Sequence, residues 1–213
     1  MERKVNLNII TLGDNSVGKT SILTRLENGS FNEETLSTMG YDKFCVKKKY
    51  EKKNVIMNLW FQDTAGQDRF QESIPAGYIR NSHIVLLVFC DIETLNSLKK
   101  RWIKFYEEKA NLKLSKFILV GNKSDIFDEE RDEIIKQGEK FAEEINAQFI
   151  TCSAKSADNM DNLERFIINE AKELIDELEK TFNIKNSVDI RYLNNTSFAL
   201  ETNRQKKKSG CKC

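Results

Sequence analysis

The sequence predicts an α/β fold with a mostly parallel sheet, and two patterns along the chain carry this prediction. Continuous apolar runs at residues 84–89 and 117–120 are typical of strands that are buried on both faces. Between and after these runs, apolar residues recur at helical spacing over residues 95–110, 132–146 and 158–179. Strands that alternate with helices in this way favour a parallel sheet covered by helices.

The other elements follow from local patterns. We expect the first strand at residues 5–12 and a helix at residues 20–26. Two strand-like segments, residues 44–49 and 54–61, flank a Lys-rich turn and predict an antiparallel hairpin. The last strand is expected at residues 149–152.

The domain organisation follows from the point where the helical pattern stops. After about Thr181 the chain turns rich in Asn, Ser and Lys, which is typical of a flexible segment. The whole chain has 213 residues, of which 39% are hydrophobic and 31% charged, as in an ordinary globular domain. We therefore expect one domain over residues 1–180 and a flexible tail over residues 181–213.

Composition excludes several classes of function. The 34 Lys and Arg residues nearly balance the 33 Asp and Glu residues, so no overall basic field predicts a nucleic-acid partner. The single histidine, His83, argues against a His-rich metal site and a Ser-His-Asp triad. The five cysteines lack the regular pairing of a secreted framework, and the first residues lack the apolar core of a signal peptide. We expect a cytoplasmic protein unless its tail attaches it to a membrane.

Residues 13–20 fit the phosphate-loop pattern G-x-x-x-x-G-K-[ST], between a predicted strand and a predicted helix. Backbone amides and the helix dipole favour a phosphate there. The alternative is an incidental Gly-containing turn, which would not require a strand before it and a helix after it. Lys19 would neutralise the β- and γ-phosphates during hydrolysis, and the Thr20 hydroxyl would bind Mg²⁺. The expected phosphate-binding residues are Asp14, Asn15, Ser16, Val17, Gly18, Lys19, Thr20 and Ser21.

A second segment, Asn122-Lys123-Ser124-Asp125, follows the buried strand at residues 117–120 and predicts recognition of guanine. The Asp125 carboxylate can accept hydrogen bonds from N1–H and the exocyclic amine of guanine, a donor pair that adenine lacks. Lys123 can lie against the purine face, and Asn122 can tie this loop to the phosphate loop. A backbone N–H for the guanine O6 is expected from the segment after the last strand, namely Ser153, Ala154 and Lys155.

The hydrolytic residues are expected near Asp63-Thr64-Ala65-Gly66-Gln67, which ends another strand. Asp63 would hold Mg²⁺ through a water, the Gly66 amide would contact the γ-phosphate, and Gln67 would orient the attacking water. Thr38 is the candidate second protein ligand of Mg²⁺. Phe31 has two interpretations, a stacking partner for guanine or a core residue.

With these segments in this order, the chain resembles the Ras superfamily of small GTPases over about residues 5–180. Residues 63–70 and the Cys-x-Cys ending are similar to the Rab family, and residues 74–82 resemble its Golgi-acting members more faintly. The resemblance implies a P-loop GTPase fold: a six-stranded, mostly parallel sheet with one antiparallel edge strand and five helices. It also implies a switch in vesicle trafficking that is active with GTP and inactive with GDP, and that hydrolyses GTP slowly until an activating protein stimulates it.

The same resemblance implies partners and a place in the cell. We expect effectors, an exchange factor, a GTPase-activating protein, a GDP-dissociation inhibitor and a Rab prenyltransferase to bind a monomeric protein, with GTP or GDP and Mg²⁺ as its ligands. At the tail, Cys211 and Cys213 resemble the Rab site of double geranylgeranylation, because Gly210 stands where a simple C-a-a-X box needs cysteine. Two lipid chains, with the lysines at residues 206–208, would anchor the protein on the cytoplasmic face of endomembranes.

Three departures from the Rab pattern concern the effector surface. Lys43 stands where Rabs carry an aromatic residue, and no aromatic residue covers the nucleotide near Glu34. Rabs carry Trp directly before the Asp of D-T-A-G. Here either two residues are inserted after Trp60, or Gln62 replaces the tryptophan. These changes leave open a nucleotide-locked binding scaffold with little hydrolysis, whereas the guanine segment disfavours an ATP-using enzyme.

Overall fold

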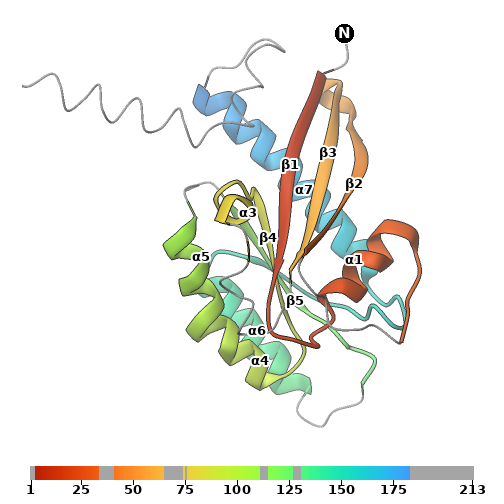
Figure 1. The fold of residues 1–213 in the computed structure, drawn as a ribbon, viewed down its shortest axis with the longest axis vertical. Coiled ribbons are helices and arrows are strands. Elements are labelled where there is room, and N and C mark those ends of the chain that lie inside the picture. Colours follow the sequence, from red (N-terminus) through yellow and green to blue (C-terminus); the bar gives the residue numbers. More distant parts are fainter. Residues whose placement is uncertain are drawn as a thin grey trace, which may run out of the picture.

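The computed structural model describes residues 3–33, 41–64, 74, 76–110, 115–126 and 131–182. Within these residues, a central sheet of six strands is covered by helices on both faces (Figure 1). The strands are β1 (Arg3–Leu12), β2 (Tyr41–Tyr50), β3 (Val55–Thr64), β4 (Ile84–Phe89), β5 (Lys116–Gly121) and β6 (Gln148–Thr151). They lie in the order β2-β3-β1-β4-β5-β6, and every pairing is parallel except that of the edge strand β2 with β3. This confirms the predicted sheet.

The described helices are α1 (Lys19–Asn28), α3 (Ala76–Arg80), α4 (Ile92–Ser97), α5 (Ile103–Lys109), α6 (Arg131–Glu144) and α7 (Met160–Phe182). A π-helical turn, Leu98–Trp102, joins α4 to α5, so these two form one continuous helical rod. Counted in this way, the described residues hold five helical segments, the number that the resemblance implies, although α3 was not among the helical ranges predicted from the sequence. The predicted start of the rod at residue 95 is wrong, because Asp91 caps the helix and begins it at Ile92.

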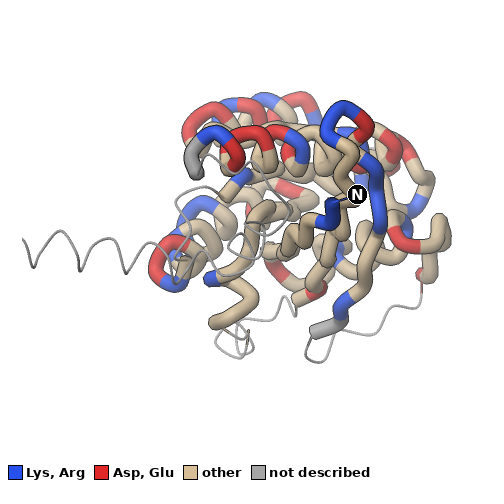
Figure 2. The backbone as a smooth tube through the Cα atoms, turned by 90° about the horizontal axis from the view of Figure 1, so that it is seen from above, with Lys and Arg blue, Asp and Glu red and all other residues tan. Residues whose placement is uncertain are grey.

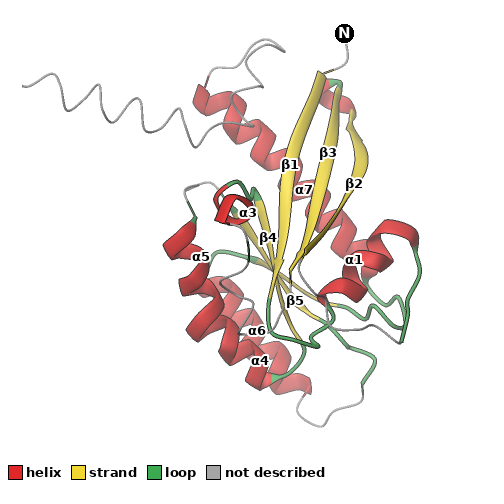
Figure 3. Ribbon diagram, in the orientation of Figure 1, coloured by secondary structure: helices red, strands yellow, loops and turns green. Residues whose placement is uncertain are grey.

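Two apolar cores flank the sheet, one on each face. Figure 3 shows the helices that cover the sheet. On one face, α1 and α7 bury residues such as Ile22 and Leu174 against the sheet. On the other face, α3, the α4–α5 rod and α6 bury residues such as Ile79, Trp102 and Phe141. β4 contributes to both cores because all six of its residues are buried, as its continuous apolar run predicts.

The β2–β3 hairpin is paired without interruption from Tyr41↔Thr64 to Tyr50↔Val55. A 3-10 turn, Glu51–Lys53, closes it, where the Lys-rich turn is predicted. Because side chains alternate along a strand, Trp60 and Gln62 lie on the same face of the sheet. Lys43 pairs with Gln62, and its Nζ lies 4.5 Å from the centre of the Trp60 ring. Lys43 and Trp60, two residues that differ from the Rab pattern, thus lie in contact with each other.

The far end of the hairpin is tied to α7 by charged groups. Arg3 contacts Glu179 at 2.7 Å, and Lys53 contacts Asp176 at 2.7 Å and also pairs with Glu179. The Tyr50 hydroxyl donates to the Asp176 carboxylate at 3.2 Å. α7 therefore spans one face of the sheet and is fastened to the hairpin near its own C-terminal end.

Lysines are concentrated on the edge strand β2, which carries Lys43, Lys47, Lys48 and Lys49 and shows as a blue stretch in Figure 2. Lys48 is paired with Glu164 of α7 at 2.6 Å, whereas Lys43, Lys47 and Lys49 lie on the opposite face and are exposed.

Among the helices that the structure describes, none has the length and apolar character needed to cross a membrane.

Candidate nucleotide-binding site

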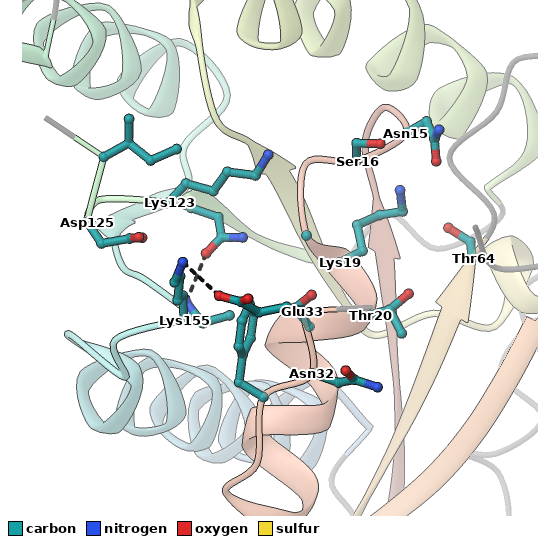
Figure 4. A pocket seen from close by; sticks show the side chains of 16 residues that line it. Asn15, Ser16, Lys19, Thr20, Asn32, Glu33, Thr64, Lys123, Asp125 and Lys155 are labelled. Carbon is teal, nitrogen blue, oxygen red and sulfur yellow. Dashed lines mark hydrogen bonds and ion pairs between the residues drawn. The ribbon is translucent and has the colours of Figure 1, made fainter. Parts of the chain in front are cut away.

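A cavity of about 350 Å³ lies at the carboxyl ends of the parallel strands, beside the N-terminus of α1 (Figure 4). This is where ligands bind in open α/β sheets. Twelve of the residues expected to bind nucleotide line it: Asn15, Ser16, Gly18, Lys19, Thr20, Ser21, Phe31, Asn122, Lys123, Asp125, Ala154 and Lys155. Four other predicted residues, Asp14, Val17, Asp63 and Ser153, do not line the cavity and instead support residues that do.

Lys19 begins α1 and folds back over the phosphate loop. Its Nζ donates to the backbone carbonyls of Gly13 at 3.0 Å and Asp14 at 2.7 Å. The side chain is only 5% exposed. Burial lowers the pKa of Lys19 from 10.5 to about 8, although the carboxylates of Asp63 and Asp14 oppose the shift. A buried ammonium group held by backbone carbonyls is arranged to receive an anion.

The phosphate loop and the guanine loop are joined through Asn122. Its Nδ2 donates to the Val17 carbonyl at 2.8 Å, which confirms the predicted tie. Gly18, with φ +93°, makes this contact possible, because a Cβ there would lie 2.1 Å from Asn122 Nδ2. The Asn122 Oδ1 accepts from the Ala154 amide at 3.1 Å, so one side chain connects three loops.

The predicted Mg²⁺ ligands Thr20 and Asp63 lie next to each other. The Thr20 hydroxyl donates to Asp63 Oδ2 at 2.6 Å, and the Asp63 residue is 5% exposed. Thr11 holds the other carboxylate oxygen at 3.5 Å. A hydroxyl and a carboxylate oxygen at the edge of a phosphate-sized cavity form the kind of donor set that Mg²⁺ prefers, so these residues fit the ion.

Asp125 stands at the opposite end of the cavity from these residues (Figure 4). Its Oδ1 accepts from the Ser153 hydroxyl at 2.5 Å. Ser153 is fully buried, and its Oγ also accepts from the Ser156 amide at 3.0 Å. In this structure Ser153 therefore fixes the orientation of the Asp125 carboxylate and does not line the cavity, whereas Ala154 and Lys155 of the same segment do line it.

Four further residues that sequence reasoning missed also line the cavity, namely Asn32, Glu33, Thr64 and Ile126. Glu33 forms an ion pair with Lys155 across the mouth, with 2.9 Å between Oε1 and Nζ (Figure 4). The hydrogen bond from Lys155 lowers the pKa of Glu33. Phe31 packs against the core and also lines the cavity, so its core contact is observed, whereas its stacking on guanine stays a prediction. No local pattern links Glu33 to Lys155, since the two are far apart in the sequence.

Several predicted residues lie outside the described residues. They are Thr38, Gly66, Gln67, Cys211 and Cys213. The roles expected of them in binding Mg²⁺, in hydrolysis and in lipid attachment remain predictions from the sequence.

Comparison with known proteins places this geometry in a family. The Ras family model matches residues 8–173, which include both loops and the strand that ends at Asp63 and Thr64. The chain is also 36% identical over 159 residues to the Ras-related protein SEC4 of Saccharomyces cerevisiae (strain ATCC 204508 / S288c), covering 74% of this chain and 71% of that protein. The loop arrangement, the family match and this identity agree, and the chain belongs to the Ras family of small GTPases as a Rab-like member.

Proposed function

We propose that this protein is a molecular switch that binds GTP, hydrolyses it to GDP and phosphate, and regulates vesicle trafficking. The observation that carries the proposal is the single cavity with chemically different ends. Lys19 and Thr20 stand at one end, with Asp63 hydrogen-bonded to Thr20, and Asp125 stands at the other. The Asn122 side chain links the two ends, so recognition of the base and of the phosphates is mechanically connected.

Each expected site residue has a task in this proposal. Lys19 keeps its bonds to the loop carbonyls of Gly13 and Asp14 and directs its remaining N–H to the β- and γ-phosphate oxygens of GTP. Thr20 and Asp63, together with Thr38, would hold Mg²⁺, which supplies positive charge against the phosphate oxygens when it is bound. Gln67 orients the attacking water, and no side chain forms a covalent bond to the substrate.

The base is read by Asp125, which Ser153 holds in place, with Lys123 against the purine face and Phe31 at the mouth. Adenine offers no donor pair to this carboxylate and would leave it unpaired in the site. Sites built around such pairing discriminate by roughly 10⁴-fold or more.

The switch is proposed to act on membranes. The named relative SEC4 is Ras-related, and the Cys-x-Cys ending of this chain supports attachment of two geranylgeranyl groups to Cys211 and Cys213. We propose that the lipidated protein works on the cytoplasmic face of endomembranes, with an exchange factor, an activating protein, effectors and a GDP-dissociation inhibitor as partners. Replacement of both cysteines by serine should remove it from the membrane fraction, and replacement of Cys45 by serine serves as the control.

The deciding experiment measures bound nucleotide and single-turnover hydrolysis of the purified full chain in the presence of Mg²⁺. We expect co-purified guanine nucleotide and slow cleavage of GTP that Gln67→Leu slows further without loss of binding. Bound GTP that is never cleaved, even with activating proteins added, would favour the binding scaffold instead. Equal binding of ATP and GTP would contradict the proposal altogether.

A further inference from the structure

The carboxylate of Asp14 connects the phosphate loop to the α4–α5 rod. Its Oδ1 accepts hydrogen bonds from the Ser97 hydroxyl at 2.9 Å and the Trp102 Nε1 at 2.7 Å, and it also pairs with the Arg101 guanidinium. Three donors from one helical rod thus converge on a single oxygen of a residue in the phosphate loop. Nothing in the loop's sequence pattern requires such a contact, because the pattern leaves this position open.

The π-helical turn explains why the three donors share one face of the rod. In a regular α-helix, residues five apart point about 140° away from each other, so Ser97 and Trp102 would diverge. A turn with i→i+5 hydrogen bonds holds more residues, so residues five apart are brought closer to the same side. Ser97 directly precedes the turn Leu98–Trp102, and Trp102 is its last residue. Such turns occur often at functional sites.

The donors themselves are held in place. Trp102 is fully buried and meets Phe105 edge to face with 6.0 Å between ring centres. The Arg101 guanidinium lies 5.1 Å from the centre of the Trp102 ring. A buried indole N–H needs an acceptor, and Asp14 provides it. The carboxylate is therefore bound by an indole that the core fixes and by a guanidinium that lies against that indole.

Asp14 also contacts Lys19 through its backbone. The Asp14 carbonyl accepts from Lys19 Nζ at 2.7 Å, so one residue binds the rod by its side chain and the lysine by its main chain. The preceding Gly13 lies against the end of β4, where an added Cβ would be 2.2 Å from the Val88 carbonyl oxygen. The start of the phosphate loop is thus confined between β4 and the rod.

We propose that Arg101 and Trp102 are positioning residues that act through Asp14 to hold the phosphate loop and Lys19 in the geometry that binds the β-phosphate. This inference rests on the proposed binding of guanine nucleotides. It assigns to the α4–α5 rod a role in phosphate affinity that is separate from recognition of the base, since neither residue lines the cavity.

The test compares full-length variants by the dissociation rate and affinity of GDP, and by the affinity of GMP measured at millimolar concentration by NMR. Arg101→Gln and Trp102→Phe should each weaken GDP binding by about tenfold, the equivalent of one hydrogen bond to a charged group. GMP, which lacks the β-phosphate, should bind them as it binds the unmodified protein. Arg101→Lys should restore part of the loss, and Lys104→Gln, on an exposed face of the same rod, should have no effect.

A double-mutant cycle separates positioning from general destabilisation. If Arg101 acts through Asp14, Arg101→Gln should have no further effect on GDP binding in an Asp14→Ala background. Additive losses, or equal losses for GDP and GMP, would overturn the inference while leaving the switch intact. Absence of GDP binding by the unmodified protein would instead overturn the proposed function itself. Trp102→Phe alters the core, so the Arg101 variants decide the matter if that protein does not fold.

Discussion

At the residue scale, Lys19 combines a buried position with a required charge. Its pKa is lowered to about 8 mainly by burial, so near pH 8 the nucleotide-free protein begins to lose this charge. Phosphate oxygens favour the charged form, and the bound protein keeps its proton to higher pH. Between these two pKa values, nucleotide binding takes up a proton and must weaken as pH rises.

We therefore predict that GDP affinity falls by about tenfold between pH 7 and pH 9, since pH 9 is one unit above the pKa. Titration calorimetry across this range measures the effect. Lys19→Gln should bind GDP weakly and show no such decline, which also corrects for titration of the nucleotide itself. A flat profile for the unmodified protein would contradict the proposed contact of Lys19 with phosphate.

Asp125 allows a second prediction at this scale. Asp125→Asn replaces one acceptor oxygen by a donor and should weaken GTP binding by about 100-fold, as expected for loss of a hydrogen bond to a charged group together with an unpaired donor. It should strengthen binding of the xanthine nucleotide, whose ring carries an oxygen in place of the guanine amine. Competition of GTP and XTP against a fluorescent GDP measures both changes. Unaltered preference for GTP would show that Asp125 does not read the base.

The sequence predicted those site residues whose roles depend on a short motif, and missed those whose roles depend on distant contacts. Lys19, Thr20 and Asn122 could be placed because strand, loop and helix N-terminus fix their geometry locally. The Glu33–Lys155 pair joins segments that only the folded sheet brings together. The supporting role of Ser153 was missed because spacing alone does not tell which side chains face the cavity.

At the element scale, the start of α4 depends on a capping box. Asp91 Oδ1 accepts from the Thr94 amide at 2.7 Å, and the Thr94 hydroxyl accepts in return from the Asp91 amide at 3.1 Å. Burial alone would raise the pKa of Asp91, but hydrogen bonds from Thr94 and from the Cys90 thiol lower it. A carboxylate with a lowered pKa stabilises the folded state above its unfolded pKa, and this contribution disappears as pH falls through the folded value.

Asp91→Ala should reduce the free energy of unfolding by about 1 kcal/mol at pH 7, the usual effect of losing a side-chain cap. Urea denaturation measures this change, with Glu93→Ala as the control because Glu93 lies in the same helical turn without capping it. The difference between Asp91→Ala and the unmodified protein should shrink at pH 3. An equal difference at both pH values would mean that the carboxylate charge is not what stabilises the helix.

The elements themselves were predicted to different degrees. The strands β4 and β5 could be predicted from their continuous apolar runs, because a strand that is buried on both faces carries apolar residues on both. The early start of α4 was missed although Asp91, three residues before Thr94, is a cap signal that the sequence contains. The π-helical turn could not have been predicted, since its donors converge on Asp14, which lies more than eighty residues away in the chain.

At the scale of the whole molecule, the ion-pair network of Arg3, Lys53, Asp176 and Glu179 joins the first strand, the hairpin and the last helix. Burial alone would lower the pKa of Lys53, but its hydrogen bonds to Asp176 and Glu179 raise it. The stabilisation from this charge is therefore present below pH 10.5 and is lost only as pH rises through the higher folded value. At neutral pH, salt is the more practical probe of the network.

Lys53→Ala should lower the free energy of unfolding by about 1 kcal/mol at low salt, because it leaves two partly buried carboxylates without their shared partner. The loss should be smaller at 1 M salt, where the screening length falls to about 3 Å. Lys52→Ala, an exposed neighbour, is the matched control. Chemical denaturation at two salt concentrations measures both variants, and equal effects of the two substitutions would remove the network as a source of stability.

The lysines of the edge strand β2 have a consequence for the behaviour of many copies of this protein. An unpaired strand edge offers free backbone donors and acceptors to any similar edge, and charged side chains, lysine especially, are a common defence against such pairing. Two molecules that approached with their β2 strands side by side would press exposed ammonium groups from Lys43, Lys47 and Lys49 against one another. This repulsion works against edge-to-edge aggregation, so copies of the protein can be concentrated in a small space and still remain separate.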